Sequence, residues 1–174
     1  MESKEKEITM ISNYNYQVFK GKLNELTTKG KPEIKGNPFA ILSFNNSKCP
    51  FYDLVNEGEF RISRNSNFFS IPFLIEGNFS ENKYNTDVNY QVKPIAFGYY
   101  WLRILPALIN FILIISFIIN YKRLEIDSYK PDKIIVAILL FEIFIFAPLF
   151  FSELGKRKFE TKFLEELKIL NKNS

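Results

Sequence analysis

Two long apolar stretches constrain the fold of this 174-residue chain more than any other feature. The first, YYWLRILPALINFILIISFIINY, runs from Tyr99 to Tyr121 and would be about 33 Å long as a helix, which matches a bilayer core with its interfaces. The second, from Ile134 to Ser152, follows a polar connector, KRLEIDSYKPDK, that is long enough to reverse the chain. The pattern predicts an antiparallel transmembrane hairpin over residues 98–154, with spans at about 99–121 and 134–152.

Residues that favour a membrane interface flank these stretches. Aromatic side chains open the first span, and a run of basic side chains follows the second. Both kinds are typical of the headgroup level of a bilayer, where a ring or an alkyl stem meets apolar surface and its polar end meets water. The predicted interface anchors are Tyr99, Tyr100, Trp101, Lys156, Arg157 and Lys158.

Four polar side chains are spaced so that they would meet between the two spans. Asn110 and Glu142 lie near the midpoints of their spans, where an ionised carboxylate facing lipid would cost several kcal/mol. Arg103 shares a helix face with Asn110, and Glu153 shares one with Glu142. An antiparallel pair would therefore also bring Arg103 and Glu153 together, and we call these four residues the polar seam.

Three roles for Glu142 remain open at this stage. It could fix the hairpin through a hydrogen bond worth roughly 1 kcal/mol or less. It could instead face a polar group of another subunit. As a third role, it could be a protonatable site in an ion path, which would require an oligomer because two spans cannot enclose a path alone.

The region before the spans has the composition of a β domain. Residues 1–13 begin with alternating acids and bases, MESKEKEITM, and predict a solvated tail. From 14 to 97, short apolar and aromatic runs alternate with turns rich in Gly, Pro, Asn and Asp, which predicts strands. We expect an α+β membrane protein whose amino-terminal part is a small all-β domain, either a sandwich or a partly open barrel. A short helical turn fits KGKLNELTTKG equally well.

The last segment, residues 155–174, has the pattern of an amphipathic helix. Phe159, Phe163, Leu167 and Leu170 recur at helical spacing against a face of Lys and Glu. Such a helix could lie along the membrane interface. Packing against the β domain to complete its small core is an equally good alternative.

The composition removes most classes of enzyme. The chain has no histidine and a single cysteine, Cys49, so it cannot form a Ser-His-Asp, Cys-His or Cys-rich zinc site alone. It also lacks GxxxxGK[ST] and GxGxxG motifs. Asp53, Glu57, Glu59 and Glu76 could in principle share acid–base work, but solvated surface charge accounts for them better. We expect no enzyme, no cofactor and no metal site, and the scattered basic residues predict no nucleic-acid binding.

Basic residues near the span ends favour one orientation. Eight lie on the domain side and four in the connector, so the positive-inside rule places the β domain and the carboxyl terminus in the cytoplasm. The eight are Lys93, Arg103, Lys156, Arg157, Lys158, Lys162, Lys168 and Lys172, and the four are Lys122, Arg123, Lys130 and Lys133.

Together these features predict a multi-pass membrane protein that is a non-catalytic accessory, scaffold or anchoring subunit of a larger complex. Its partners would be the lipid bilayer and other membrane subunits, with a hetero-complex favoured over a homo-oligomer. Two alternatives come from other classes of protein. One is an oligomeric proton- or ion-conducting subunit that uses Glu142, and the other is a membrane-anchored β domain that senses a ligand.

Overall fold

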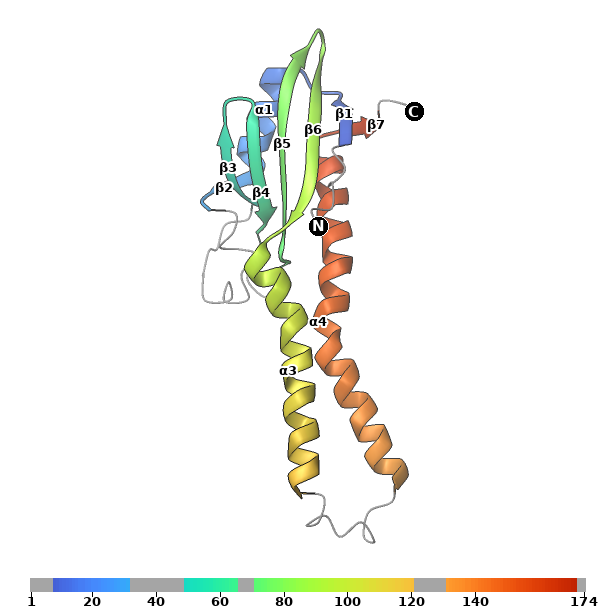
Figure 1. Cartoon of the computed structure of the whole chain (residues 1–174). Helices are drawn as coiled ribbons and strands as arrows, with labels where there is room; N and C mark the ends of the chain where they lie inside the picture. The colour runs from blue at the N-terminus through green and yellow to red at the C-terminus, as the bar shows by residue number, and fades with distance from the viewer. Residues whose placement is uncertain (1–7, 32–48, 66–70, 121–130, 172–174) are drawn as a thin grey trace.

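The structure is a computed structural model of the chain, and it describes residues 8–31, 49–65, 71–120 and 131–171. A sheet with helices packed on it forms a domain, and two long helices leave one end of that domain (Figure 1). The α+β class expected from the sequence is confirmed.

The described strands form one sheet with the order β2-β3-β4-β5-β6-β1-β7. Only β2 and β3 pair in parallel, and the other neighbours are antiparallel. A sandwich or a barrel was the wrong expectation for this part of the chain, because helices rather than a second sheet cover the apolar face. The strands are β1 (Ile8–Ser12), β2 (Thr27–Lys29), β3 (Phe51–Asn56), β4 (Glu59–Arg64), β5 (Phe73–Asn82), β6 (Asn85–Pro94) and β7 (Ile169–Asn171).

Strand β1 corrects the prediction of a solvated tail over residues 1–13. It pairs with β6 on one side and with β7 on the other, so it is an internal strand of the sheet. The buried Ser12 hydroxyl donates to the carbonyl of Leu167 at 2.6 Å, which ties the two ends of the chain together. The alternating charges of the first residues hid the ITMIS stretch that forms this strand, and residues 1–7 lie outside the described part.

Helix α1 (Tyr16–Leu26) replaces a strand expected near residue 14 and extends the helical turn that was the alternative for KGKLNELTTKG. Asn15 caps it by accepting a hydrogen bond from the backbone N–H of Val18 at 2.9 Å. Phe19 and Leu23, four residues apart, are fully buried against the sheet. A capped segment with an apolar pair at this spacing buries more surface as a helix than as a strand.

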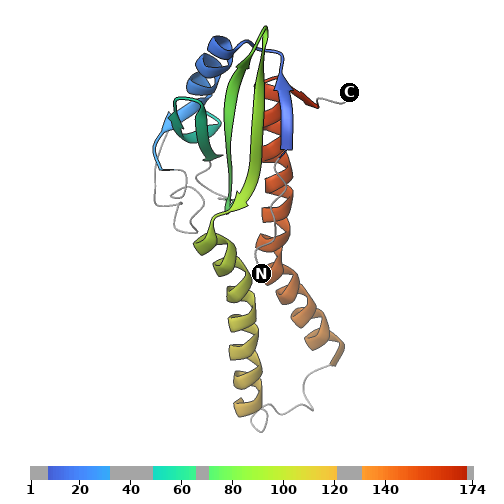
Figure 2. The ribbon, with the colours of Figure 1, turned by 45° about the horizontal axis from the view of Figure 1, so that its top comes forward.

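Helix α4 (Pro131–Glu166) is one continuous helix that enters the domain from the second apolar stretch. Its last turns lie along the sheet in two views of the molecule (Figures 1 and 2). Phe159, Phe163 and Leu167 are buried in the core, so this segment packs on the sheet, as one of the two sequence-based alternatives proposed.

The prediction of a helix over residues 155–174 was wrong at its end: α4 stops at Glu166, and residues 169–171 form β7 at the edge of the sheet because they pair with β1. Leu170, expected on the apolar face of the helix, is exposed on this strand.

Aromatic rings dominate the core between the sheet and α4. The ring of Phe163 lies 5.4 Å from that of Tyr90, 5.5 Å from Phe60 and 6.4 Å from Phe51, measured between centroids. The Tyr90 hydroxyl donates to the Glu160 carboxylate at 3.1 Å. Burial, and secondly the negative charge of Glu160, raise the pKa of Tyr90 above its usual value, so its hydroxyl keeps its proton.

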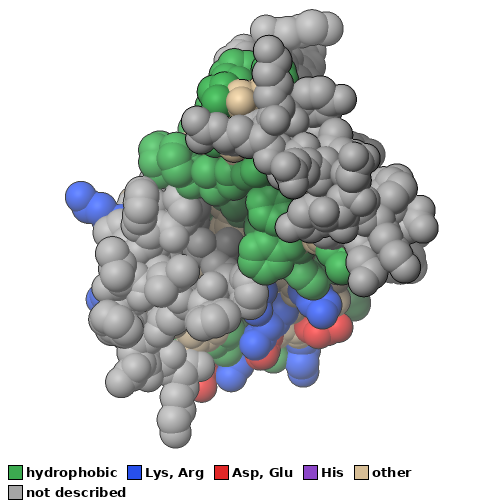
Figure 3. All heavy atoms as spheres, turned by 90° about the horizontal axis from the view of Figure 1, so that it is seen from below, with side chains coloured by type: hydrophobic (Ala, Val, Ile, Leu, Met, Phe, Trp, Pro, Cys, Tyr) green, Lys and Arg blue, Asp and Glu red, His purple; other side chains and the backbone are tan. Residues whose placement is uncertain are grey.

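Helices α3 (Ala96–Asn120) and α4 are both long and apolar enough to cross a membrane, by length and composition. In the 18-residue apolar stretch of each helix only 11% of the residues are buried within the chain, and the helices diverge away from the domain (Figure 1). Seen from the hairpin end, their visible described surface is hydrophobic, and the visible charged side chains lie at its margin (Figure 3). The connector at 121–130 lies outside the described residues.

Candidate functional site

The two helices contact each other through the polar seam, whose outer pair lies next to the domain. An Nη2 atom of Arg103 lies 3.2 Å from Oε1 of Glu153 and forms an ion pair with it. The Arg103 guanidinium also lies 3.4 Å from the centroid of the Tyr99 ring and donates to the Tyr99 carbonyl at 3.2 Å. Tyr99 in turn packs edge-on against Phe73 at the base of the sheet. This pair therefore joins α3, α4 and the domain at one point.

The inner pair of the polar seam lies deeper along the helices. Nδ2 of Asn110 donates to Oε2 of Glu142 at 3.2 Å and to the carbonyl of Pro106 at the same distance. Both side chains are half-buried, whereas most of their neighbours on α3 and α4 are exposed. The structure thus brings together both pairs that the depth and helix-face arguments placed opposite each other.

In chemical terms, the inner pair consists of the Glu142 carboxyl group hydrogen-bonded to the Asn110 amide. Between residues 104 and 120 and between 134 and 152, Glu142 is the only Asp, Glu, Lys, Arg or Tyr in the sequence. A proton relay needs a further group that can accept the proton, and neither segment supplies one. The arrangement suits a hydrogen bond that orients two helices.

The predicted interface anchors fall into two groups. Tyr100, Trp101, Arg157 and Lys158 are exposed, and the Trp101 ring stacks on Phe97 at 6.1 Å. The other two anchors, Tyr99 and Lys156, are half-buried and lie against the ring of Phe73, with Lys156 Nζ 5.0 Å from its centroid. These two side chains therefore also fix the helices to the base of the sheet.

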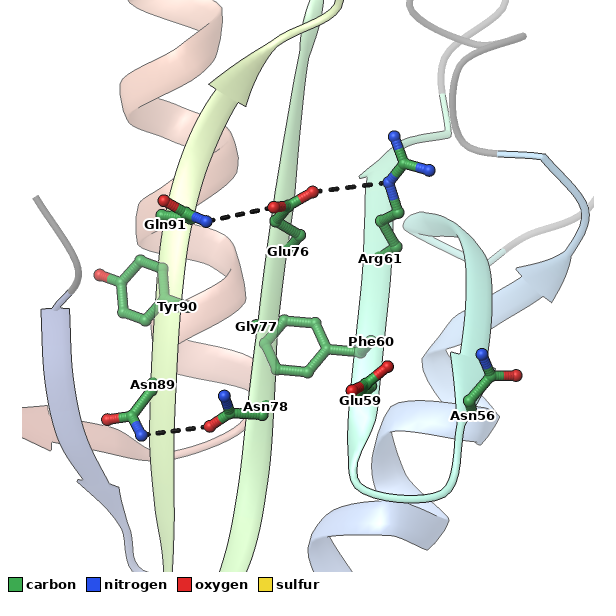
Figure 4. A pocket seen from close by; sticks show the side chains of 10 residues that line it. All are labelled: Asn56, Glu59, Phe60, Arg61, Glu76, Gly77, Asn78, Asn89, Tyr90 and Gln91. Carbon is green, nitrogen blue, oxygen red and sulfur yellow. Dashed lines mark hydrogen bonds and ion pairs between the residues drawn. The ribbon is translucent and has the colours of Figure 1, made fainter. Parts of the chain in front are cut away.

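A second candidate site is an open pocket of about 340 Å³ on the sheet face that the helices leave uncovered (Figure 4). Glu76 on β5 is its centre: it forms ion pairs with Arg61, at 3.6 Å, and with Lys93, and accepts a hydrogen bond from Gln91 at 3.1 Å. The residues that line the pocket are Asn56, Glu59, Phe60, Arg61, Glu76, Gly77, Asn78, Asn89, Tyr90 and Gln91.

The carboxylates singled out in the sequence do not gather into an acid–base pair among the described residues. Glu76 is held by two cations, Glu57 is exposed and lies 3.9 Å from Lys20, and Glu59 is exposed at the pocket. The side chain of Asp53 lies outside the described part. No group of three or more potential metal ligands occurs in the described ranges.

Sequence reasoning did not find the amide groups of this pocket. The side chain of Asn89 donates to that of Asn78 at 3.1 Å across β5 and β6, and two residue pairs further along the side chain of Gln91 donates to Glu76. The signal was present as alternation: the residues at 76, 78, 89 and 91 are polar, while apolar residues or glycine occupy the positions between them.

Comparison with known proteins gives no match: no protein-family model, curated protein or solved structure corresponds to this chain. The described molecule is an α+β sheet domain joined to two long apolar helices.

Proposed function

We propose that this protein is a membrane-anchored, non-catalytic accessory, scaffold or anchoring subunit of a larger membrane assembly. The observation that carries the proposal is the apolar surface of α3 and α4, where the chain buries only 11% of the residues in the apolar stretch of each helix. A bilayer and neighbouring subunits are the surroundings that would cover such a surface. The domain and the carboxyl terminus would face the cytoplasm.

The connections between helices and sheet support a scaffold in particular. Strand β6 runs into α3 with one residue between them, and the N–H of that residue, Ile95, donates to the Pro72 carbonyl at 2.8 Å. Helix α4 passes without a break into the core of the domain. Two rigid connections of this kind would hold the domain at a fixed height and angle above the membrane.

One observation favours a second candidate function, a membrane-anchored domain that binds a polar ligand. The pocket around Glu76 offers a carboxylate, a guanidinium and several side-chain amides on a sheet face that no described helix covers. These groups already bond to one another, so a ligand would have to replace those contacts. We therefore rank this function below the scaffold.

The proposal predicts the state of the protein after extraction. We expect the chain to stay with membranes in alkaline carbonate and, after gentle solubilisation, to be recovered in one discrete hetero-complex by native mass measurement. A homo-oligomer would instead favour the ion-conducting alternative. A monomer, or a chain washed off the membrane, would contradict the proposed function.

A second prediction concerns Glu142. If the inner pair only orients the helices, Glu142→Gln keeps a hydrogen-bonding partner for Asn110 and should leave the recovery of the complex unchanged. Glu142→Leu should weaken the hairpin by about 1 kcal/mol. Asn110→Leu should cost a similar amount, and the double variant should cost little more than either single change, because both remove the same bond.

Proton flux in reconstituted vesicles separates this prediction from the conducting alternative. A proton carrier would lose its flux in Glu142→Gln while the assembly survives, since an amide does not titrate. Fully additive effects of Asn110→Leu and Glu142→Leu on complex recovery would show that the two side chains do not act as a pair.

A further inference from the structure

A second pocket, separate from the pocket around Glu76, lies where the sheet domain meets α4. It is at the end of the domain from which the long helices leave. It has a volume of about 330 Å³ and lies between the start of β3, the end of β4 and one face of α4. The β4 arrow ends on the helix side of the domain (Figure 1). The described residues that line this pocket are Cys49, Pro50, Phe51, Arg64, Asn65, Lys158, Phe159 and Lys162.

The charges of this pocket have one sign. Arg64, Lys158 and Lys162 line it, and no carboxylate does so among the described residues. The described ion pairs leave out these three cations, whereas Arg61, Lys93, Arg103, Lys20 and Lys22 each lie beside a Glu. Lys158 and Lys162 are four residues apart on α4, a spacing at which like charges repel and destabilise a helix. A bound anion would relieve that repulsion.

Packing and hydrogen bonds hold the backbone that carries the three cations in place. Phe159, between the two lysines, is buried, and its ring lies 5.9 Å from the ring of Phe51. The Arg64 guanidinium lies close to α4. If Gly155 had a Cβ atom, that atom would lie 3.8 Å from Nη1 of Arg64. Asn65 donates its side-chain amide to the Cys49 carbonyl at 2.8 Å, which holds the other wall. The three cationic side chains themselves are exposed, so binding would order the side chains but would not need to order the backbone, which lowers the entropy lost.

The height of the pocket matches the headgroup layer of a membrane. The apolar stretch of α4 ends at Ser152, and along the helix Lys158 lies about 8 Å and Lys162 about 14 Å beyond Glu153. A headgroup layer is about 5–8 Å thick on each side of the hydrocarbon core. The backbone of Arg64 and Lys158 would therefore lie at or just outside the layer of lipid phosphates. Their side chains are long enough to reach those phosphates.

We propose that this pocket binds the phosphate of an anionic phospholipid headgroup, with Arg64 and Lys158 as its principal ligands and Lys162 above them. Guanidinium and ammonium groups from two elements suit a phosphate, because the planar fork of Arg can bind two oxygens while Lys adds a point charge. The inference rests on the proposed membrane location. It adds a specific lipid site to the general attraction of basic residues for a negatively charged surface.

Binding of short-chain lipids to the full chain in an uncharged detergent tests the proposal, since it does not require insertion in a bilayer. The probes are dihexanoyl phosphatidylglycerol and dihexanoyl phosphatidylcholine, and the readout is the dissociation constant of each. We expect the wild-type chain to prefer phosphatidylglycerol by about tenfold or more. Equal binding of the two lipids would overturn the pocket and leave the proposed function standing, whereas loss from carbonate-washed membranes would overturn the proposed function.

Two variants that remove the same charge separate the pocket from general electrostatics. Arg64→Gln with Lys158→Gln should abolish the preference to within about twofold, while Lys156→Gln with Arg157→Gln, in the same turn of α4 but outside the pocket, should retain most of it. Equal losses would overturn the proposal. If the first variant fails to fold, Lys162→Gln alone should lower the preference about threefold, and no change would count against the site.

Inorganic phosphate serves as the last probe, because it carries the same chemistry without the lipid. We expect it to compete with phosphatidylglycerol only at a concentration at least about tenfold higher, since it lacks the glycerol and acyl groups that extend from the pocket. Competition at equal concentration would show that the pocket takes free phosphate and would overturn the assignment to a lipid.

Discussion

Replacing Phe163 by alanine is expected to lower the stability of the sheet domain by about 3–5 kcal/mol, the cost of removing a fully buried aromatic side chain. The ring contacts Phe51, Phe60 and Tyr90, so the cavity would open between α4 and the middle of the sheet. Hydrogen exchange of the β6 amides around Tyr90, measured on the full chain in detergent, reports the free energy of opening at that place.

The matched control is an aromatic residue on the same domain that packs against little. Tyr84, in the turn between β5 and β6, is 88% exposed, and Tyr84→Ala should change the stability by no more than about 0.5 kcal/mol. A loss below about 1 kcal/mol for Phe163→Ala would contradict the packing of α4 on the sheet. Such a result would favour the other alternative, in which the carboxyl-terminal helix lies along the membrane interface.

The features that could be predicted from the sequence depend on local pattern. An apolar stretch long enough for a bilayer identifies a candidate span by itself, and equal depth with a shared helix face placed Asn110 opposite Glu142 and Arg103 opposite Glu153. The hydrophobic spacing of Phe159, Phe163 and Leu167 similarly revealed a helix.

What could not be predicted depends on contacts between distant parts of the chain. A strand pattern does not say whether a second sheet or a helix will cover it. Here α4 covers the sheet, and it begins at Pro131, 67 residues after β4 ends at Arg64. Strand β1 is too short to be recognised from its own residues, because it is defined by its pairing with β6 on one side and β7 on the other. The cations of the second pocket come from β4 and α4, so their convergence has no sequence signal.

The sheet domain is attached to the two long helices in different ways, and this affects how a movement of the helices would be transmitted to the sheet. Helix α3 continues from β6, a central strand, while α4 lies across the apolar face and ends beside β7 at the edge. Arg103, Tyr99 and Glu153 connect the two helices where they leave the domain. A change in the angle between the helices would therefore act on the sheet at two places: on β6 through α3, and on the apolar core through α4.

The second large effect is expected at Gly77, where β5 and β6 approach closely. Gly77 is paired with Tyr90, and a Cβ atom there would meet the Asn89 carbonyl oxygen and lie 2.9 Å from the Tyr90 Cα. These are backbone atoms, so they cannot move aside as the end of a side chain can. Gly77→Ala should destabilise the domain by about 3 kcal/mol, the upper end of the usual cost of overpacking, because the two central strands must separate.

Gly21 provides a control of opposite sign with the same substitution. It lies inside α1, is exposed, and a Cβ atom there would meet nothing within 4 Å. Gly21→Ala should therefore stabilise the domain by about 0.5–1 kcal/mol, because alanine loses less backbone entropy in a helix. Both variants are measured by exchange of the β5 and β6 amides. If Gly77→Ala exchanged like the wild type, the close approach of β5 and β6 would be contradicted, since no side-chain movement could accommodate the added methyl group.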